Sequence, residues 1–443
     1  MSAIGARGQP GKSKSFAVIG AGAAGLCYAK YLLQEGYADI TVFEIGTQIG
    51  GLWCYKNDSG RSAAYRSLHI NTARNLTAFS DLPFDDDVQM FPSCKDMHDY
   101  LIKYADKFGV TPLIRFNSRV TSVEPAPDYN AEAPRWSLTT EDGFSRDYDR
   151  VIVATGHLSE PLHIDNLRNN FKGEYLHSFD FREPEPFAGK KVCIVGVGNS
   201  AVDIASDVCV TTEQTVMVAR SGVMIGPKLI FGVPFTDLTM KLYRNWIPDR
   251  LRRWVISALV YAVHGPMEKL GFKPLTKRAH PTTSAVVVQH IAYNRVQIKN
   301  GIEKIQGKRI FFSDGSSEEF DTMIAATGYQ VDLPFIPERV VPIVNNSVSL
   351  YKRVVPPQWR GLYFGGFFNT TTALNLVFEH QAKWIASIEA GRMKLPSAAE
   401  MERRIVEKQN WIAKYYKASP RHTIEEEHLF YLKELRVGRS STA

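Results

Sequence analysis

The stretch SFAVIGAGAAGLCYAKYLLQEGY (residues 15–37) decides the fold of this 443-residue chain. A short apolar and β-branched run ends in Gly20, Gly22 and Gly25, and a helical pattern follows as far as Gly36. The glycines permit a tight turn, a close approach of the backbone to a pyrophosphate and close packing of helix on strand. The stretch therefore predicts the strand, phosphate-binding turn and helix of a Rossmann-like dinucleotide-binding domain.

The sequence that follows favours a flavin nucleotide in this first site. DITVFE (residues 39–44) ends at Glu44, 24 residues after Gly20, where a carboxylate can bind ribose hydroxyls. GTQIGGLWCY (residues 46–55) then places Gly51, Leu52 and Trp53 on a loop directly after that strand. Glycines at this point let the chain approach a bulky flat cofactor, so we predict FAD here.

The same pattern occurs a second time. In KKVCIVGVGNSAVDIASDVC (residues 190–209), a strand leads into Gly196, Gly198 and Ala201 and then into a helix. We therefore predict a second Rossmann-like unit, with a phosphate-binding turn that also contains Asn199 and Ser200.

The ribose position of this second unit carries the opposite charge. QTVMVARSG (residues 214–222) ends in Arg220, again 24 residues after the first glycine. Glu44 would repel a 2′-phosphate, whereas Arg220 with Ser221 can bind one through a planar cationic fork. This difference predicts NADPH in the second site. The alternative for Arg220 is an ordinary surface residue.

Two similar strands indicate how the units are joined. YDRVIVATGHLSEP (residues 148–161) and FDTMIAATGYQVDLPF (residues 320–335) each run into A-T-G, and the second unit lies between them. We therefore expect an α/β fold with two Rossmann-like dinucleotide-binding domains, the NADPH domain being inserted into the FAD domain. The predicted limits are a mobile tail (1–14), the first part of the FAD domain (15–165), the NADPH domain (166–325, with an insertion at 226–281), and the second part of the FAD domain with C-terminal helices (326–443). The helix within residues 361–391 is expected to aim its N-terminus at the flavin.

Composition narrows the class of protein. The net charge of +7 suits an anionic dinucleotide, but the Lys and Arg are scattered, so we expect no nucleic-acid binding. Five separated cysteines without a C-x-x-C pair indicate a reducing, cytoplasmic location and no disulfide framework or zinc site. The longest apolar run, residues 254–263, is about half of a membrane span and predicts a buried or interfacial helix rather than an anchor.

A linker motif extends the argument from fold to family. FKGEYLHSFDF (residues 171–181) spaces Phe171, Gly173, His177 and Phe181 as F-x-G-x-x-x-H-x-x-x-F. This motif resembles the signature of flavin-containing monooxygenases, which are class B flavoprotein monooxygenases, here of the soluble bacterial type. GAGAAG, GGLW, YRSLHINTARNLTAFSDLPF, ATGH, GVGNSA, ATGYQVDLPF and EHQAKW also follow the family's order. The related Baeyer–Villiger enzymes have Trp where this chain has Phe181.

The resemblance implies a monooxygenase that uses FAD, NADPH and O₂. NADPH would reduce FAD, O₂ would add at C4a, and the hydroperoxyflavin would oxygenate a nucleophilic nitrogen or sulfur of a small amine or sulfide. The alternatives are a Baeyer–Villiger monooxygenase acting on ketones and a dinucleotide-binding sensor without turnover. The family also implies a homodimer.

The resemblance further assigns residues to roles. Asn71 matches the active-site Asn, whose neutral amide can donate to a flavin peroxide; the alternative is a turn cap. Asn199 matches a position beside the nicotinamide; the alternative is a helix N-cap. His69 and Gln381 are expected to contact the cofactors, and His177 to position the linker and NADP⁺ pocket. EEEHLFY (residues 425–431) is interpreted as a charged helix face rather than a metal site.

Overall fold

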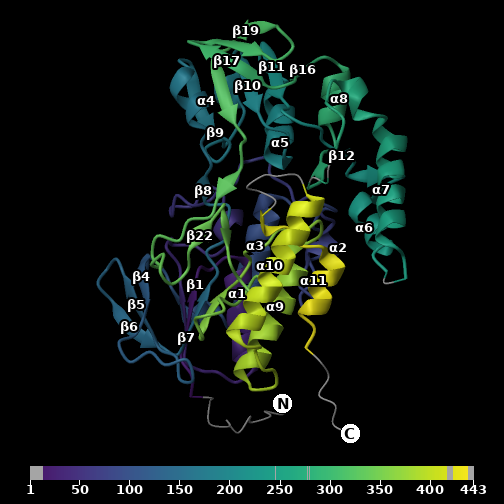
Figure 1. The fold of residues 1–443 in the computed structure, drawn as a ribbon. Coiled ribbons are helices and arrows are strands. Elements are labelled where there is room, and N and C mark those ends of the chain that lie inside the picture. The colour runs from purple at the N-terminus through teal and green to yellow at the C-terminus, as the bar shows by residue number, and fades with distance from the viewer. Residues whose placement is uncertain (1–12, 245, 277, 279, 417–422, 438–443) are drawn as a thin grey trace.

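The structure, a computed structural model, describes residues 13–244, 246–276, 278, 280–416 and 423–437. The chain forms two lobes, stacked one above the other in Figure 1, and each lobe contains a five-stranded parallel sheet. The predicted α/β fold is confirmed.

The first sheet has a centre that is buried on both faces. Its order is β24 (Leu362–Phe364), β7 (Arg150–Val153), β1 (Phe16–Ile19), β2 (Ile40–Phe43) and β3 (Ile114–Arg115). Phe16 and Val18 of β1 pack into one core cluster with the helices, while Ala17 and Ile19 pack into a second cluster on the opposite face. Because both faces of β1 are buried, its sequence is a continuous run of apolar residues.

Different elements cover the two faces of the first sheet. The helical side contains α1 (Ala23–Gln34), α3 (Cys94–Lys107), α9 (Leu374–Glu389), α10 (Ala398–Tyr415) and α11 (His428–Glu434). The other side contains an antiparallel meander of β4 (Val120–Pro125), β5 (Trp136–Thr140) and β6 (Ser145–Tyr148). Helix α3 begins with a capping box, in which Ser93 and Asp96 each satisfy the other's backbone N–H.

The second sheet repeats this plan. Its order is β16 (Val296–Lys299), β11 (Gln214–Val218), β10 (Lys191–Val195), β20 (Thr322–Ala325) and β9 (Glu174–His177). It is accompanied by α4 (Asp165–Asn170), α5 (Asn199–Val208), α8 (Val287–Ala292) and a meander of β17 (Ile302–Gln306), β18 (Arg309–Phe312) and β19 (Ser317–Glu319).

The strand orders of the two sheets correspond element by element. The strand before each glycine turn, β1 or β10, lies in the centre between the next strand of its unit, β2 or β11, and the A-T-G strand, β7 or β20. All strands of the second sheet fall between β7 and β24 in the sequence. The second unit is therefore inserted into the first, as predicted.

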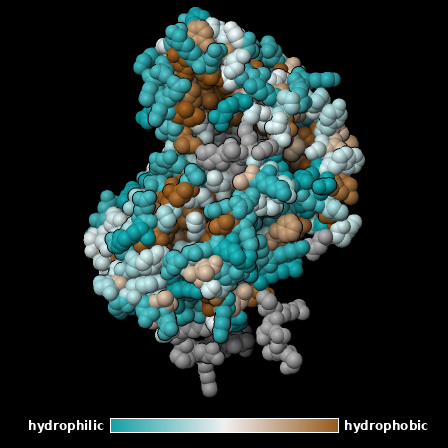
Figure 2. Space-filling view, in the orientation of Figure 1, coloured by the Kyte–Doolittle hydropathy of each residue, from teal (hydrophilic) through white to brown (hydrophobic). Residues whose placement is uncertain are grey.

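The segment 226–281 extends along one side of the molecule. It contains α6 (Phe235–Lys241) and α7 (Asp249–His264), which lie on the right in Figure 1. Helix α7 carries the long apolar run and buries Val260, but Trp254 is 67% exposed and Tyr261 62%. None of the described helices is long and apolar enough to cross a membrane. The face seen in Figure 2 is largely hydrophilic, with separate hydrophobic patches.

Short elements complete the chain, and part of the predicted tail is described. The helical turns are Gly51–Trp53, α2 (Arg74–Thr77), Thr111–Leu113, Glu185–Phe187 and Met267–Leu270; the short strands are β8 (Glu160–Pro161), β12 (Ile225–Gly226), β13 (Leu229–Ile230), β14 (Val233–Pro234), β15 (Thr282–Thr283), β21 (Tyr329–Gln330), β22 (Ile343–Val344) and β23 (Ser347–Val348). Residues 1–12 of the tail lie outside the described part. Lys14, in the predicted tail, donates to a Glu389 carboxylate oxygen at 2.7 Å.

Candidate functional site

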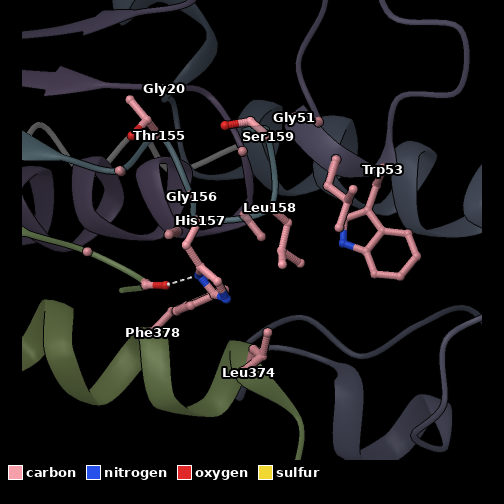
Figure 3. Close-up of a pocket in the computed structure, with 18 of the residues that line it drawn as sticks. Gly20, Gly51, Trp53, Thr155, Gly156, His157, Leu158, Ser159, Leu374 and Phe378 are labelled. Atoms are coloured by element: carbon pink, nitrogen blue, oxygen red, sulfur yellow. Dashed lines mark hydrogen bonds between the residues drawn. The ribbon is translucent and has the colours of Figure 1, made fainter. Parts of the chain in front are cut away.

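A cavity of about 690 Å³ is lined by residues of both halves of the chain. Nine residues predicted from the sequence line it: Gly20, Gly22, Glu44, Gly51, Leu52, Trp53, His69, Asn71 and Asn199. Figure 3 shows Gly20, Gly51 and Trp53 around the A-T-G-H segment, with Leu374 and Phe378 of α9 opposite. Folding thus brings the FAD fingerprint and the first residue of α5 to one space.

The first glycine turn is shaped by contact with the A-T-G crossover. Gly20 has φ +106°, and a Cβ there would lie 2.7 Å from the carbonyl oxygen of Ala154. Gly196 has φ +135°, and a Cβ would lie 2.3 Å from the carbonyl oxygen of Ala326. Both turns therefore pack against the backbone of the first residue of an A-T-G tripeptide, where only glycine leaves room.

The N-terminus of α1 is suited to a pyrophosphate. Its N-cap is Gly22, which provides no side-chain acceptor for the first amides. Gly22 and Gly51 face each other closely, since a Cβ on Gly51 would lie 3.2 Å from the Gly22 Cα. The two glycine loops thus form a narrow cradle into which a dinucleotide fits.

Glu44 is built into this cradle. Its carboxylate accepts the N–H of Ala21 at 2.8 Å and the N–H of Gly46 at 3.0 Å. Burial raises the pKa of the Glu44 carboxyl, against the lowering effect of these two donors. The residue therefore fixes the glycine turn, and it lines the cavity where ribose hydroxyls are expected.

Asn71 presents a polar group for which the described residues offer no partner. Its Oδ1 is buried and has no hydrogen-bond donor within the described part of the chain. A buried amide oxygen normally has a donor, so the N–H or O–H groups of a bound flavin nucleotide fit this position. The turn-cap alternative receives no support, because no hydrogen bond from the Asn71 side chain to a neighbouring backbone group is present among these residues.

Loop 65–71, which carries Asn71, is attached to the second unit. The Tyr65 hydroxyl donates to Asp203 Oδ2 of α5 at 2.7 Å, and the Arg66 N–H donates to the Arg182 carbonyl at 2.9 Å. Burial raises the pKa of Asp203 to about 6. These contacts hold the loop beside the second nucleotide turn.

Asn199 reaches out of the second glycine turn. Gly198 is the N-cap of α5, and Asn199 is the first helical residue. The Asn199 Oδ1 accepts the N–H of Thr283 at 3.0 Å. Its side chain therefore joins the turn to β15 at the cavity wall, and the N-cap alternative is wrong.

The remaining residues predicted to bind NADPH lie outside the cavity lining. This group comprises Gly196, Gly198, Ser200, Ala201, Arg220 and Ser221. Ala201 is buried in the core below the turn, and Arg220 follows β11 with an exposed side chain. An exposed guanidinium beside the turn is compatible with a 2′-phosphate.

The linker motif is a packing unit next to the cavity and does not line it. Phe171 and Phe181 belong to two core clusters of the second unit, and a Cβ on Gly173 would meet the carbonyl oxygen of Asp321 at 2.5 Å. His177 ends β9, is fully buried, and packs against His163 and Tyr329.

Gln381 does not contact the cavity, contrary to our expectation. It is fully buried, and its Oε1 accepts the Tyr28 hydroxyl at 2.5 Å and the Gly366 N–H at 3.2 Å. Its Nε2 donates to Tyr431 at 2.6 Å. Because these partners occupy the carboxamide, Gln381 supports the Gly366 backbone instead of touching the cofactor.

Sequence reasoning assigned no role to several residues that line the cavity. His157 Nδ1 lies 3.0 Å from the Gly366 carbonyl oxygen, the contact dashed in Figure 3. The loop 369–373 and the first turn of α9 also line the cavity, as the predicted direction of that helix requires. The A-T-G-H motif was a usable signal for His157.

His280 is a further lining residue that has no local motif. Its ring contacts Glu425, which lies 145 residues away. Glu425 and Glu426 are buried and precede α11, so the interpretation of this segment as a charged helix face is wrong. Among the described residues, no three His, Cys, Asp or Glu side chains are grouped to hold a metal ion.

Together, the two linked dinucleotide folds and the shared cavity define a flavoprotein oxidoreductase that uses a nicotinamide cofactor. The chain matches the family model "Flavin-binding monooxygenase-like" over residues 13–440. It therefore belongs to the flavin-binding monooxygenase-like family and is an NADPH- and O₂-dependent monooxygenase that contains FAD.

Individual relatives agree with this assignment. The chain is 33% identical to flavin-containing monooxygenase 5 of Oryctolagus cuniculus, over 95% of this chain and 82% of the relative. The structure of S-allyl-L-cysteine S-oxygenase from Allium sativum matches with a TM-score of 0.71 and 27% identity, over 95% of this chain and 87% of that one. Cyclohexanone monooxygenase from Rhodococcus sp. Phi1 bound to NADP⁺ matches with a TM-score of 0.68 and 18% identity, over 95% and 96%, a likeness of fold.

Proposed function

We propose that this enzyme oxygenates nucleophilic nitrogen or sulfur atoms of small molecules that enter the 690 Å³ cavity. The observation that carries the proposal is that Asn71 of the first nucleotide unit and Asn199 of the second line the same cavity. Hydride donor, flavin and substrate can therefore share one space. The relative named as an S-oxygenase supports sulfur as one target atom.

The residues of the chain have three tasks in this reaction. When bound, FAD reduced by NADPH supplies the chemistry that activates O₂ for transfer of one oxygen atom. Asn71 offers a neutral amide that donates hydrogen bonds without giving up a proton. The first turn of α9, whose N-cap Ala373 has no capping side chain, directs its positive end toward the cavity. Apolar lining residues such as Leu52, Leu374 and Phe378 exclude water.

Product analysis tests the reaction class. The FAD-loaded enzyme would be incubated with NADPH and O₂ and, separately, with thioanisole, N,N-dimethylbenzylamine or cyclohexanone. We expect the sulfoxide and the N-oxide. Lactone as the main product would favour the Baeyer–Villiger alternative. No steady consumption of NADPH in air would favour a sensor without turnover.

The organisation of the protein is part of the proposal. We propose domain limits at residues 15–165, 166–325 and 326–443, a homodimer, and a cytoplasmic location. Limited proteolysis with mass spectrometry would test the limits, and light scattering coupled to gel filtration would test the dimer. The domain limits would be contradicted if cleavage within β10 preceded cleavage near residue 166 or 326. The homodimer would be contradicted by a monomer at all concentrations.

A further inference from the structure

Tyr65 anchors the loop that carries Asn71 in the core of the second nucleotide unit. The tyrosine is 5% exposed and belongs to a core cluster whose other buried members lie between Phe181 and Ile324. Its ring packs edge to face on Phe181, with 5.8 Å between the ring centroids. A residue that precedes the second unit in the sequence is thus part of the hydrophobic core of that unit.

The Tyr65 hydroxyl reaches the face of α5 that carries Asn199. It donates to Asp203 Oδ2 at 2.7 Å. Asp203 lies four residues after Asn199 on α5, and residues four apart lie on the same face of a helix. Asn199 lines the cavity. The bond from Tyr65 therefore places loop 65–71 along the helix face whose first residue borders the active site.

The ionisation of the two groups makes this hydrogen bond a charge-assisted one. Burial, followed by the charge of Asp203, raises the pKa of Tyr65, so the phenol keeps its proton and is the donor. Burial raises the pKa of Asp203 to about 6, against the lowering effects of the Tyr65 hydrogen bond and of the charge of Lys228. Above neutral pH Asp203 is therefore mostly a carboxylate. A hydrogen bond to a carboxylate is stronger than one between neutral groups.

The end of the loop next to Asn71 contacts both units. In the first unit, the Ile70 N–H donates to the Pro92 carbonyl at 2.9 Å. From the second unit, Lys228 Nζ lies 3.5 Å from the Ile70 carbonyl oxygen. Asn71 follows directly, so its position depends on contacts with both units.

Asn71 depends on its loop for its placement. Its Oδ1 is buried, and no group of the described residues donates a hydrogen bond to it. The backbone of the loop therefore decides where this amide lies in the cavity that it lines. A small displacement of a group that acts on the reacting atoms is costly for the reaction.

We propose that Tyr65 is a positioning residue, which fixes Asn71 relative to the second nucleotide unit through Asp203; the inference rests on the proposed function. The flavin is bound by the first unit and the nicotinamide by the second, and the Asn71 amide has to act where the two meet. When the bond to Asp203 is removed, the amide is displaced and oxygen transfer to the substrate fails. NADPH, O₂ and a proton then give NADP⁺ and hydrogen peroxide.

Coupling measurements test this role. With the holoenzymes of wild type, Tyr65→Phe, Asp203→Ala and Asp203→Asn, we would measure the hydrogen peroxide and the sulfoxide formed from thioanisole, at a pH above the pKa of Asp203. We expect the peroxide-to-sulfoxide ratio to rise by about tenfold in Tyr65→Phe and in Asp203→Ala, because one charge-assisted hydrogen bond is lost. Asp203→Asn keeps an oxygen that accepts from Tyr65, so its ratio should be near that of wild type.

Two further measurements separate positioning from general damage. The rate of anaerobic flavin reduction by NADPH should be the same in Tyr65→Phe as in wild type, because the glycine turns and the hydrogen bond between Asn199 and Thr283 are unchanged. Hydrogen exchange followed by mass spectrometry should show faster exchange of the loop 65–71 amides in Tyr65→Phe. This second measurement does not depend on turnover.

The role also requires that Tyr65 act through Asn71. In the absence of substrate, we would measure how fast the NADPH-reduced enzyme returns to oxidised flavin in oxygenated buffer. Tyr65→Phe should accelerate this return in the wild-type background and add nothing to it in an Asn71→Ala background. Accelerations that add in the double variant would overturn the inference.

Tyr148→Phe is the matched control for Tyr65→Phe. It removes the hydroxyl of another buried tyrosine, which donates to Thr41 Oγ1 at 3.2 Å within the first unit. Neither of these two residues lines the cavity. The peroxide-to-sulfoxide ratio of Tyr148→Phe should equal that of wild type.

The possible outcomes distinguish the inference from the proposed function. An unchanged ratio in Tyr65→Phe, or an equal fall in flavin reduction and sulfoxide formation, would overturn the inference. If Tyr65→Phe does not retain FAD, Asp203→Ala decides, because it removes the same bond and leaves the Tyr65 ring in the core. A wild type that forms neither sulfoxide nor N-oxide would instead overturn the proposed function.

Discussion

The backbone N–H of Phe179 donates a hydrogen bond of 3.0 Å to Nδ1 of His177. A ring nitrogen that accepts a hydrogen bond carries no proton, so the imidazole is neutral, with its hydrogen on Nε2. Burial, followed by the nearby His163, lowers the pKa of His177 to about 4. The histidine of the linker motif is thus a neutral packing residue at physiological pH, which agrees with positioning rather than proton transfer.

Acid should destabilise the protein partly through His177. The pKa is about 4 in the folded chain and about 6.5 when unfolded, so the unfolded state binds more protons in between. This contribution to stability is complete above the unfolded pKa and is lost as the pH falls toward the folded one. We expect His177→Gln to reduce the fall in unfolding free energy between pH 7 and 5 by up to about 2 kcal/mol. Urea titrations at several pH values measure the unfolding free energy. An equal dependence of that free energy on pH in the variant and in wild type would refute the prediction.

Asn71→Asp should uncouple the enzyme while FAD remains bound. A carboxylate at this position repels the negative charge that develops on reduced, oxygen-loaded flavin, whereas the amide stabilises it. We expect hydrogen peroxide to replace most of the oxygenated product per NADPH consumed. Peroxide and product assays on the same samples measure the ratio.

A matched control for Asn71→Asp is Asn75→Asp. Asn75 is exposed on α2 and is not part of the cavity lining. Asn75→Asp therefore adds the same charge as Asn71→Asp without reaching the site. Its coupling should equal that of wild type. If Asn71→Asp also coupled product formation to NADPH consumption as wild type does, Asn71 would have no role in the chemistry.

Glu44→Gln should weaken FAD binding. The carboxylate accepts two backbone N–H groups, and an amide offers only one oxygen to them, so its NH₂ faces a donor. One unsatisfied donor destabilises the glycine turn by about 1–3 kcal/mol, and a distorted turn should raise the Kd for FAD. Titration of the apoprotein with FAD, followed by flavin fluorescence, gives the Kd. An unchanged Kd would show that the turn does not depend on Glu44.

Arg220→Ala should change cofactor preference. The exposed guanidinium forms no ion pair within the described part of the chain. Arg220 follows β11, the strand that ends at the predicted ribose position. We expect the KM for NADPH to rise by about tenfold or more and the KM for NADH to change little. Arg309→Ala, on β18 and paired with Glu319, is the control. Equal changes for both nucleotides would refute the 2′-phosphate contact.

Local sequence was sufficient to predict features that depend on residues adjacent in the chain. The turns at Gly20 and Gly196 were predictable because a positive φ and a backbone contact leave room only for glycine. Gln381 shows the limit of this reasoning. It lies in a family motif, yet its carboxamide is occupied by Tyr28, Tyr431 and the Gly366 backbone. No local pattern reveals which partners a buried amide will meet.

The sequence by itself determined the two dinucleotide-binding units and their order, because these depend on glycine spacing along the chain. Only the tertiary structure decided that Asn71 and Asn199 line one cavity and that residues 424–426 are joined to its wall at Asn369. From the sequence, Glu425 was interpreted as one of several charges on the surface of a helix. It is a buried carboxylate 3.1 Å from His280 because packing brings together residues that are 145 positions apart.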